Sequence, residues 1–136
     1  MEGTNRPDLS GKTAVVTGAG GVLCREFAAA LAGCGARVAL LNRTEAKAQR
    51  VAERIAAAGG TAAAIQADVC SPESLAAAHA RVRELFGPCD ILINGAGGND
   101  PRATTDCEFF SREVMDDPAR KSFFDLDPES FSAVFG

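Results

Sequence analysis

Four short runs of apolar residues recur along the chain, and each is long enough for one β-strand. They cover residues 13–17, 37–42, 62–67 and 90–94. Their apolar residues are continuous rather than alternating with polar ones, which is typical of strands buried on both faces of a parallel sheet. The alanine-rich run at 62–67 is the weakest of the four. The pattern predicts a buried sheet of four strands.

The three segments between these runs have the residue spacing of helices. The first has apolar residues at intervals of four, four and three, and it ends at the glycines on either side of Cys34. Thr44 is predicted to cap the second helix, and Ser71 followed by Pro72 is predicted to start the third. The expected apolar face of the first helix comprises Leu23, Phe27, Leu31 and Cys34.

The alternation of strands and helices predicts an α/β fold of the Rossmann type. Such a fold has a parallel sheet with helices on both faces, joined by right-handed crossovers. After Asn94 the sequence becomes polar, and residues 95–122 are predicted to form a long loop with one short helix. Asp127, Pro128 and Glu129 then have the composition of a helix start. We expect residues 1–136 to be one incomplete domain, truncated after the fourth strand and the start of the next helix.

Composition narrows the class of protein without indicating a substrate. A formal net charge of -4 argues against nucleic acid or an anionic membrane as the main partner. No apolar run reaches the length of about 20 residues that spans a bilayer, and the polar start lacks the apolar stretch of a signal peptide, so we expect a cytoplasmic protein. The five cysteines have no CxxC spacing. This spacing favours reduced thiols and predicts no metal site.

A glycine-rich turn directly follows the first predicted strand. Gly18, Gly20 and Gly21 lie between that strand and the helix around Leu23. The free N–H groups and the positive dipole end of a helix favour a phosphate there, and glycines let the backbone approach it closely. The alternative is a plain tight turn. The order of strand, turn and helix favours a nucleotide-binding loop.

The loop departs from the dinucleotide fingerprint at two positions. Against the pattern G-x-x-x-G-x-G, Gly18 matches the first glycine, whereas Val22 and Cys24 stand at the second and third. The third glycine lets the helix pack closely on the strand, so Cys24 is expected to cost about 1–3 kcal/mol unless its surroundings have adjusted. We therefore expect Cys24→Gly to tighten dinucleotide binding or to raise stability.

The end of the second predicted strand bears on the cofactor. An acidic residue there binds the ribose 2′-OH of NAD, and a nearby arginine suits the 2′-phosphate of NADP. This chain has Asn42 followed by Arg43. We expect NADP or NAD as the cofactor, with NADP favoured. The alternative is that Arg43 is a solvated surface residue.

Four motifs in this order and spacing resemble the first half of a short-chain dehydrogenase/reductase. The first two are Leu9-Ser-Gly-Lys12 and Thr17-Gly-Ala-Gly-Gly21. The others are Asp68-Val69 and Asn94-Gly-Ala-Gly97, which matches the family's NNAG with Gly95 for the second Asn. Segments 97–105 and 122–131 are similar to the D-mannonate oxidoreductase (D-fructuronate reductase) branch. The resemblance implies hydride transfer between NAD(P) and a sugar-acid carbonyl or alcohol.

The resemblance also implies where the cofactor binds. The glycine loop and the start of the helix would line its phosphates and ribose, and residues 42–43 would face the adenosine ribose. Residues 68–69 would flank the adenine, and Asn94, Ala96 and Gly97 would form the floor beneath the ribose and the nicotinamide. Loop 98–122 would lie at the substrate mouth, since ligands bind at the carboxyl ends of such strands. The implied cofactor-binding residues are Gly18, Gly20, Gly21, Val22, Leu23, Asn42, Arg43, Asp68, Val69, Asn94, Ala96 and Gly97.

The catalytic groups of that family are absent from this sequence. The family's reaction uses a tyrosine, a lysine four residues on, a serine and an asparagine, and this chain has no tyrosine. His79 lies at helical spacing from Leu75 and Val82 and is expected to be a partly buried packing residue. The paired acids at 116–117 and at 125 and 127 are interpreted as turns and caps. We expect no catalytic residue here and no activity from this chain alone.

Two functional interpretations stay open. In the first, the chain is the cofactor-binding half of an oxidoreductase that acts on a small sugar acid and is a homo-oligomer at full length. In the second, it is a non-catalytic nucleotide-binding module or an inactive partner subunit, with a partner chain over the apolar edge of the fourth strand. A methyltransferase also has a glycine loop after its first strand, but the Asn94–Gly97 motif and the missing acid at the second strand argue against it.

Overall fold

The structure is a computed structural model that describes residues 6–135. The chain divides into two compact units, Met1–Ala96 and Gly97–Gly136. Residues 1–5, on which the expected absence of a signal peptide depends, lie outside the described residues, as does residue 136. The expectation of one domain over residues 1–136 stays a prediction.

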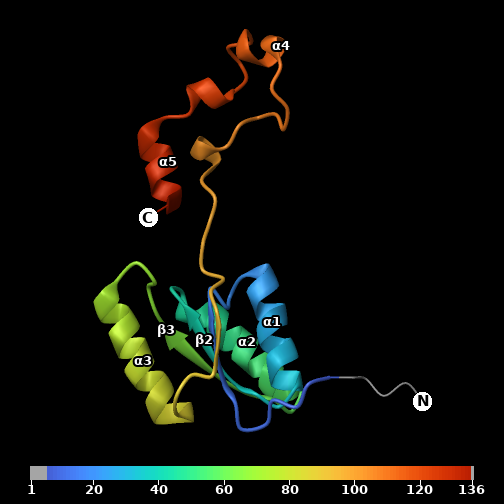
Figure 1. Ribbon diagram of the computed structural model, residues 1–136, viewed down its shortest axis with the longest axis vertical. Coiled ribbons are helices and arrows are strands. Elements are labelled where there is room, and N and C mark those ends of the chain that lie inside the picture. Colours follow the sequence, from blue (N-terminus) through green and yellow to red (C-terminus); the bar gives the residue numbers. More distant parts are fainter. Residues whose placement is uncertain (1–5, 136) are drawn as a thin grey trace, which may run out of the picture. The chain divides into compact units, whose positions relative to one another are not determined.

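The first unit is a four-stranded parallel sheet with three helices (Figure 1). The strand order is β3-β2-β1-β4, and β1 lies between β2 and β4, so that Val15 pairs with Ala39 on one side and Leu92 on the other. The predicted α/β architecture is therefore confirmed, with strand ends shifted by one residue in β3 and β4. The strands are β1 (Thr13–Thr17), β2 (Arg37–Asn42), β3 (Thr61–Gln66) and β4 (Ile91–Ile93).

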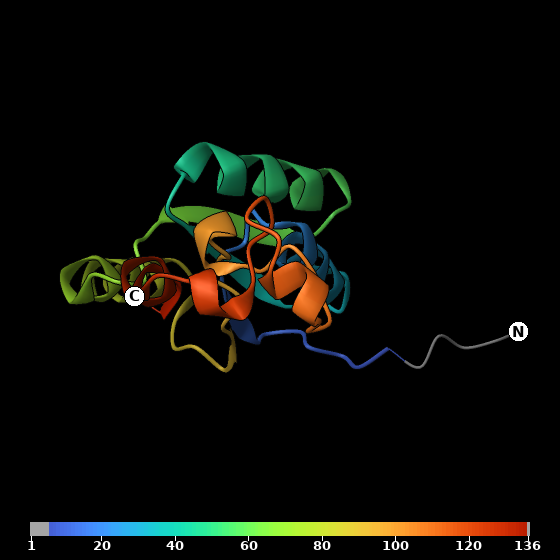
Figure 2. The same ribbon diagram turned by 90° about the horizontal axis from the view of Figure 1, so that it is seen from above.

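Helices cover both faces of this sheet, and alternate strand residues serve the two faces (Figure 2). Val16 and Leu40 pack on the side of α1 (Val22–Gly33) and α2 (Glu45–Ala57). Leu41 and Ile65 pack on the side of α3 (Pro72–Phe86), against Ala78 and Val82. Burial on both faces explains the continuously apolar sequences of the central strands β1 and β2. The edge strands β3 and β4 are mostly half-buried or exposed, so the prediction of burial on both faces is wrong for them. In the described part of the chain, no helix is long and apolar enough to cross a membrane.

The buried face of α1 differs from the predicted one. The expected stripe began at Leu23 and Phe27, but these side chains are 70% and 48% exposed. The sheet-facing residues are instead Cys24, Ala28 and Ala32, one position further along the helix. Small side chains let the helix axis lie close to the sheet, so the largest apolar residues do not mark the buried face here.

All three residues predicted to cap helices lie directly before a helix, but only two of them make a capping hydrogen bond with their side chains. Ser71 accepts a hydrogen bond from the Ser74 amide at 3.2 Å, and Pro72 follows it at the start of α3. Asp127 accepts one from the Ser130 amide at 2.6 Å. Thr44 does precede α2, but its side chain makes no capping hydrogen bond; its carbonyl accepts from the Asn42 side chain instead.

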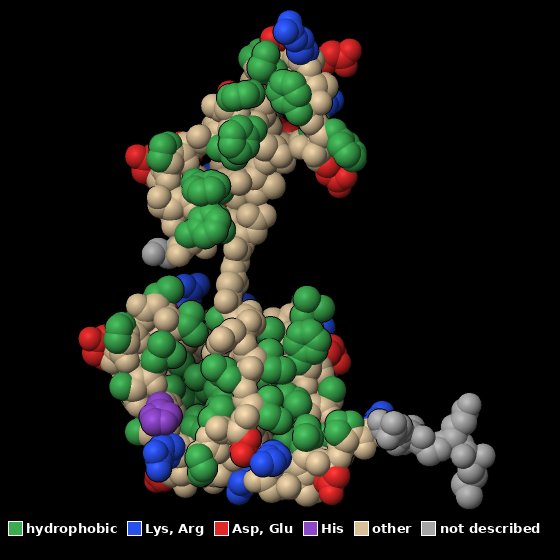
Figure 3. Space-filling view, in the orientation of Figure 1, with side chains coloured by type: hydrophobic (Ala, Val, Ile, Leu, Met, Phe, Trp, Pro, Cys, Tyr) green, Lys and Arg blue, Asp and Glu red, His purple; other side chains and the backbone are tan. Residues whose placement is uncertain are grey.

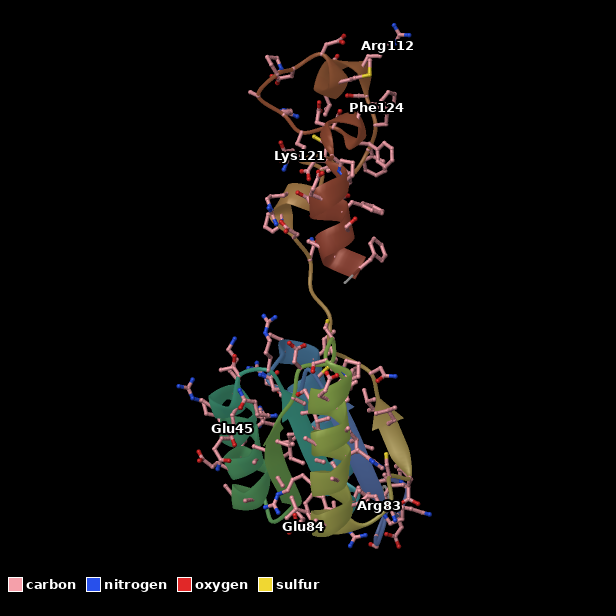
Figure 4. The ribbon with its side chains drawn as sticks, turned by 90° about the vertical axis from the view of Figure 1, so that its left-hand side faces the viewer. Glu45, Arg83, Glu84, Arg112, Lys121 and Phe124 are labelled. Atoms are coloured by element: carbon pink, nitrogen blue, oxygen red, sulfur yellow. The ribbon has the colours of Figure 1, made fainter. Side chains whose placement is uncertain are left out.

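The amino end of the sheet is held together by Asp90, which precedes β4. Its carboxylate accepts from the Thr13 amide at 2.9 Å and from Lys12 Nζ at 3.2 Å. The Thr13 amide, followed by Lys12, lowers the pKa of Asp90. Arg83 and Glu84, near the end of α3, lie toward this end of the unit (Figure 4).

The second unit consists of short elements joined by turns. The long polar loop is confirmed, and it contains one short α-helix as predicted, together with a 3-10 turn. The elements are η1 (Pro101–Ala103), α4 (Arg112–Met115), η2 (Phe123–Asp125) and α5 (Pro128–Phe135). Its phenylalanines are largely exposed, and hydrophobic side chains gather on the face of this unit seen in Figure 3. Phe124 is 71% exposed and packs edge-on against Phe123 at 5.8 Å.

Candidate functional site

The glycine loop is a tight turn between β1 and α1. Gly18 has φ +65°, a conformation that L side chains rarely adopt, and its carbonyl accepts from the Gly21 amide at 2.9 Å. Gly21 is the N-cap of α1 and has extended backbone. The Ala19 amide donates to the Leu41 carbonyl at 3.1 Å, which fixes the loop against the end of β2. The N-terminus of a twelve-residue helix therefore lies directly behind a loop of small residues.

The segment after β4 packs against this loop. The hydroxyl of Thr17, the last residue of β1, accepts hydrogen bonds from the Gly95 amide at 3.0 Å and the Ala96 amide at 3.1 Å. A Cβ at Gly18 would lie 2.8 Å from Ala96 Cα, closer than real contacts allow. Gly18 therefore satisfies two requirements, a positive φ and a close approach of two backbone segments.

The end of β2 meets the other side of the loop. Asn42 Oδ1 accepts from the Gly20 amide at 3.3 Å, and its Nδ2 donates to the Thr44 carbonyl at 2.8 Å. A Cβ at Gly20 would lie 2.7 Å from Lys47 Cβ. Lys47 was not among the predicted site residues, although a cation in the first turn of a helix that follows the second strand was a signal available in the sequence. The side chains of Arg43 and Lys47 are both exposed.

The residues after β3 complete this edge of the first unit. The Ala67 amide donates to the Asn42 carbonyl at 3.1 Å. The Asp68 amide donates to Ser74 Oγ at 2.9 Å, and its carboxylate accepts from the Cys70 amide at 3.0 Å. Val69 is 40% exposed. Asp68 and Val69 thus follow the carboxyl end of β3 on a turn that the first turn of α3 holds in place.

The structure brings the predicted residues of the first unit to the carboxyl edge of one sheet. Hydrogen bonds connect the β1 loop to both the β2 end and the β4 end, and the β2 end to the β3 end. Glu45, at the start of α2, lies toward this edge (Figure 4). Val22 and Leu23 are 69% and 70% exposed, so their apolar surface remains available there. Gly97 is the first residue of the second unit.

The chemical groups at this edge of the sheet are suited to binding an anion rather than to proton transfer. Backbone amides at a helix N-terminus attract an anion, and exposed cations follow the second strand. His79 lies elsewhere, on α3, and the prediction that it is partly buried is wrong because Ala78 and Val82 face the sheet and leave it exposed. No predicted site residue in the first unit has the burial or the charge neighbours of an acid/base catalyst.

Three of the four paired carboxylates of the second unit, those of Asp117, Asp125 and Asp127, accept hydrogen bonds at turns or helix starts, as predicted. The Ser122 hydroxyl and amide donate to Asp125 and lower its pKa, and those of Ser130 do the same for Asp127. Asp117 accepts from the Ala119 amide at 2.9 Å. Hydrogen bonds from Arg102 hold the pKa of Asp100 at about 2. These groups stabilise turns and leave no pair of free carboxylates.

Comparison with known proteins gives the class of this fold and site. The family model described as short chain dehydrogenase matches residues 12–117. The chain therefore belongs to the short-chain dehydrogenase family, and its four strands form the Rossmann-type sheet of that family.

One curated relative and two solved structures show which members of the family this chain is similar to. The chain is 49% identical over 94% of its length to UxuB of Bacillus subtilis, an oxidoreductase described as uncharacterized, and covers 45% of that protein. It is 42% identical to a candidate D-mannonate oxidoreductase of Haemophilus influenzae solved with bound NAD, covering 95% of this chain and 45% of that one, with a TM-score of 0.86. A metagenomic short-chain oxidoreductase solved with NADP is 39% identical over 68% of this chain and 42% of that chain, with a TM-score of 0.65.

The chain spans about half the length of the curated relatives it matches. The match to these relatives includes the glycine loop and the residues after β4. The chain therefore has the fold of a family with members solved with bound NAD or NADP.

Proposed function

We propose that this chain is the dinucleotide-binding half of an oxidoreductase that moves hydride between NAD(P) and the carbonyl or alcohol of a sugar acid, of the D-fructuronate/D-mannonate type. The observation that carries the proposal is the pair of hydrogen bonds from Gly95 and Ala96 to Thr17. They join the glycine loop to the segment proposed as the cofactor floor. The solved relative that holds NAD supports the nature of the ligand.

Residues of the chain fit the successive parts of a dinucleotide. The glycine loop, Gly18 to Gly21, and the first turn of α1 would hold the pyrophosphate. Glycines suit this loop because side chains there would keep the phosphates away from the backbone amides. Asn42 and Arg43 would face the adenosine ribose, and Asp68 and Val69 the adenine. Asn94, Ala96 and Gly97 would support the nicotinamide, which would supply a hydride in its reduced form and accept one in its oxidised form. On this proposal these residues bind and orient the dinucleotide.

The proton-transferring groups are proposed to lie in the part of the relatives that this chain does not match. The sequence contains no tyrosine. The loop 98–122 is proposed to contribute to the substrate side, and the protein at its natural length to form a homo-oligomer. On this proposal the chain alone binds cofactor and turns over no substrate.

The choice between NADP and NAD depends on the residues after β2. No carboxylate stands at Asn42, and the exposed cations Arg43 and Lys47 favour a 2′-phosphate. The solved relative at 42% identity holds NAD. We propose NADP as the preferred cofactor, with NAD as the alternative.

A second candidate function rests on the missing tyrosine. The chain would then be a nucleotide-binding module or an inactive partner subunit. The two candidates differ in one assay. The protein at its natural length is mixed with NADPH or NADH and D-fructuronate, and the loss of reduced cofactor is followed. Turnover supports the oxidoreductase, whereas binding of cofactor without turnover of any sugar acid supports the module.

A further inference from the structure

Cys24 and Gly95 occupy one space in the first unit. Cys24 is 7% exposed in the first turn of α1, on the face that packs against the sheet. A Cβ built on Gly95 would lie 2.0 Å from Cys24 Sγ, whereas real Cβ atoms essentially never come within 3.0 Å of a neighbour. One side chain fits between the helix and the segment after β4, and in this protein it belongs to residue 24.

The glycine at position 95 is required by this packing and not by its backbone conformation. Gly18 has a positive φ, whereas Gly95 does not. Alanine at 95 would therefore meet no backbone strain. The same Cβ would also lie 3.1 Å from the Thr17 carbonyl oxygen, a tight contact that a shift of a few tenths of an ångström relieves. The contact with Sγ is the one that excludes a side chain.

Both positions are departures from the family patterns, as is Val22 at the second glycine of the loop. Position 24 has a side chain where TGxxxGxG has glycine, and position 95 has glycine where NNAG has asparagine. Each departure taken singly disturbs the packing, by a clash or by a void. Together they move the side chain that fills this space from position 95 to position 24, so that the space stays filled.

We propose that Cys24 is a positioning residue for the cofactor floor, acting through its steric exclusion of any side chain at Gly95. Its Sγ sets how closely residues 94–96 approach α1 while Thr17 holds the Gly95 and Ala96 amides. The inference rests on the proposed function, because it assigns Cys24 a part in dinucleotide binding. It reverses the expectation that Cys24→Gly improves the protein, since that change leaves a void at Gly95.

The test is a double-mutant cycle in the protein at its natural length. Gly95→Ala, Cys24→Gly and the combined variant are compared with the parent by thermal unfolding and by titration with NADPH and NADH well below every Tm. Gly95→Ala is expected to raise Kd by about tenfold or more and to lower Tm, because the added Cβ displaces the segment. The combined variant is expected to bind within about threefold of Cys24→Gly, because the space is free again.

Two controls separate positioning from general damage. Cys24→Ser retains a side chain of similar size and is expected to keep the parent Kd. Gly33→Ala adds the same methyl group at the end of α1, where a Cβ would come no closer than 4.0 Å to any atom outside the adjoining residues and helix backbone, and is expected to leave Kd unchanged.

Three results would overturn the inference. These are a Gly95→Ala variant that binds like the parent, one that loses Tm but keeps its Kd, and a combined variant that is no better than Gly95→Ala. If Gly95→Ala does not fold, a folded combined variant supports the steric pair and an unfolded one rejects it. A parent that binds neither dinucleotide rejects the proposed function instead, and the recovery of Tm in the combined variant still decides the steric pair.

Discussion

The hydroxyl of Thr17 accepts a hydrogen bond from the Ala96 amide at 3.1 Å, across 79 residues of sequence. The same oxygen accepts from the Gly95 amide at 3.0 Å. A single side chain at the end of β1 therefore satisfies two backbone donors of the segment that follows β4. These two hydrogen bonds hold the end of β1, next to the glycine loop, against the proposed cofactor floor.

Replacing Thr17 by valine tests this connection. Valine keeps the shape but provides no acceptor, so two part-buried hydrogen bonds are lost and the free energy of unfolding falls by about 1–3 kcal/mol. Dinucleotide binding weakens as well, because the segment 95–96 is released. Chemical denaturation and cofactor titration measure the two effects. Thr17→Ser keeps the hydroxyl and should restore most of both, and a Thr17→Val variant equal to the parent would show that the hydrogen bonds contribute nothing.

The close approach at Gly18 is tested by comparison with Gly11. Both glycines have positive φ, +65° and +80°, but a Cβ at Gly18 meets Ala96 Cα at 2.8 Å while one at Gly11 meets nothing within 4 Å. Alanine at either position incurs backbone strain of about 1–3 kcal/mol. Gly18→Ala should be further destabilised and should lose dinucleotide binding, whereas Gly11→Ala should keep its Kd. Equal Tm and Kd values for the two variants would contradict the close contact.

Removing the positive charge at Arg43 tests the cofactor preference. Arg43→Gln should raise Kd for NADPH by about tenfold, the loss expected for one hydrogen bond to a charged group, and should leave Kd for NADH nearly unchanged. Lys47→Gln should have the same direction, because Lys47 lies next to Gly20. Arg50→Gln, an exposed cation further along α2, is the matched control. Equal losses for both cofactors would place the 2′-phosphate elsewhere.

The helix start of α5 should depend on pH through Asp127. Its pKa lies below the ordinary value of 3.8 because Ser130 donates to its carboxylate in the folded state. The stabilisation is therefore present above about pH 4 and is lost as the pH falls through the lowered pKa. The Ser130 amide resonance should titrate with a midpoint below 3.8, and the Arg102 amide, bound to Asp100, with one at about 2. Midpoints at or above 3.8 would contradict these caps.

The periodicity of the sequence was sufficient to predict the sheet but not the faces of its helices. Strands buried on both sides leave a continuous apolar signal, and turns and caps such as Ser71 depend on neighbouring residues. The face of α1 could not be found in this way, because close packing on the sheet selects Cys24 and Ala28 rather than the largest apolar residues. His79 was misplaced for the same reason, since Ala78 is the residue that packs inward.

The candidate site could be predicted where its signals are local. Its signals are the glycines after β1, the start of α1 and the residues after β2. Each of these signals spans only a few consecutive residues. The bonds of Thr17 to Gly95 and Ala96, and the exclusion between Cys24 and Gly95, join segments about 70 to 80 residues apart. Their geometry depends on how β1 and β4 pair, which a single sequence leaves undetermined.

Direct titration of the protein with NADPH and NADH tests the central claim, which is that the edge formed by the glycine loop and residues 94–96 binds a nicotinamide dinucleotide. The account predicts saturable binding of at least one cofactor with a Kd between about 1 μM and 1 mM, the range that enzyme KM values usually cover. It also predicts that Gly18→Ala abolishes this binding and Gly11→Ala does not. Absence of binding of both cofactors by a folded parent, or binding that survives Gly18→Ala unchanged, would contradict the account.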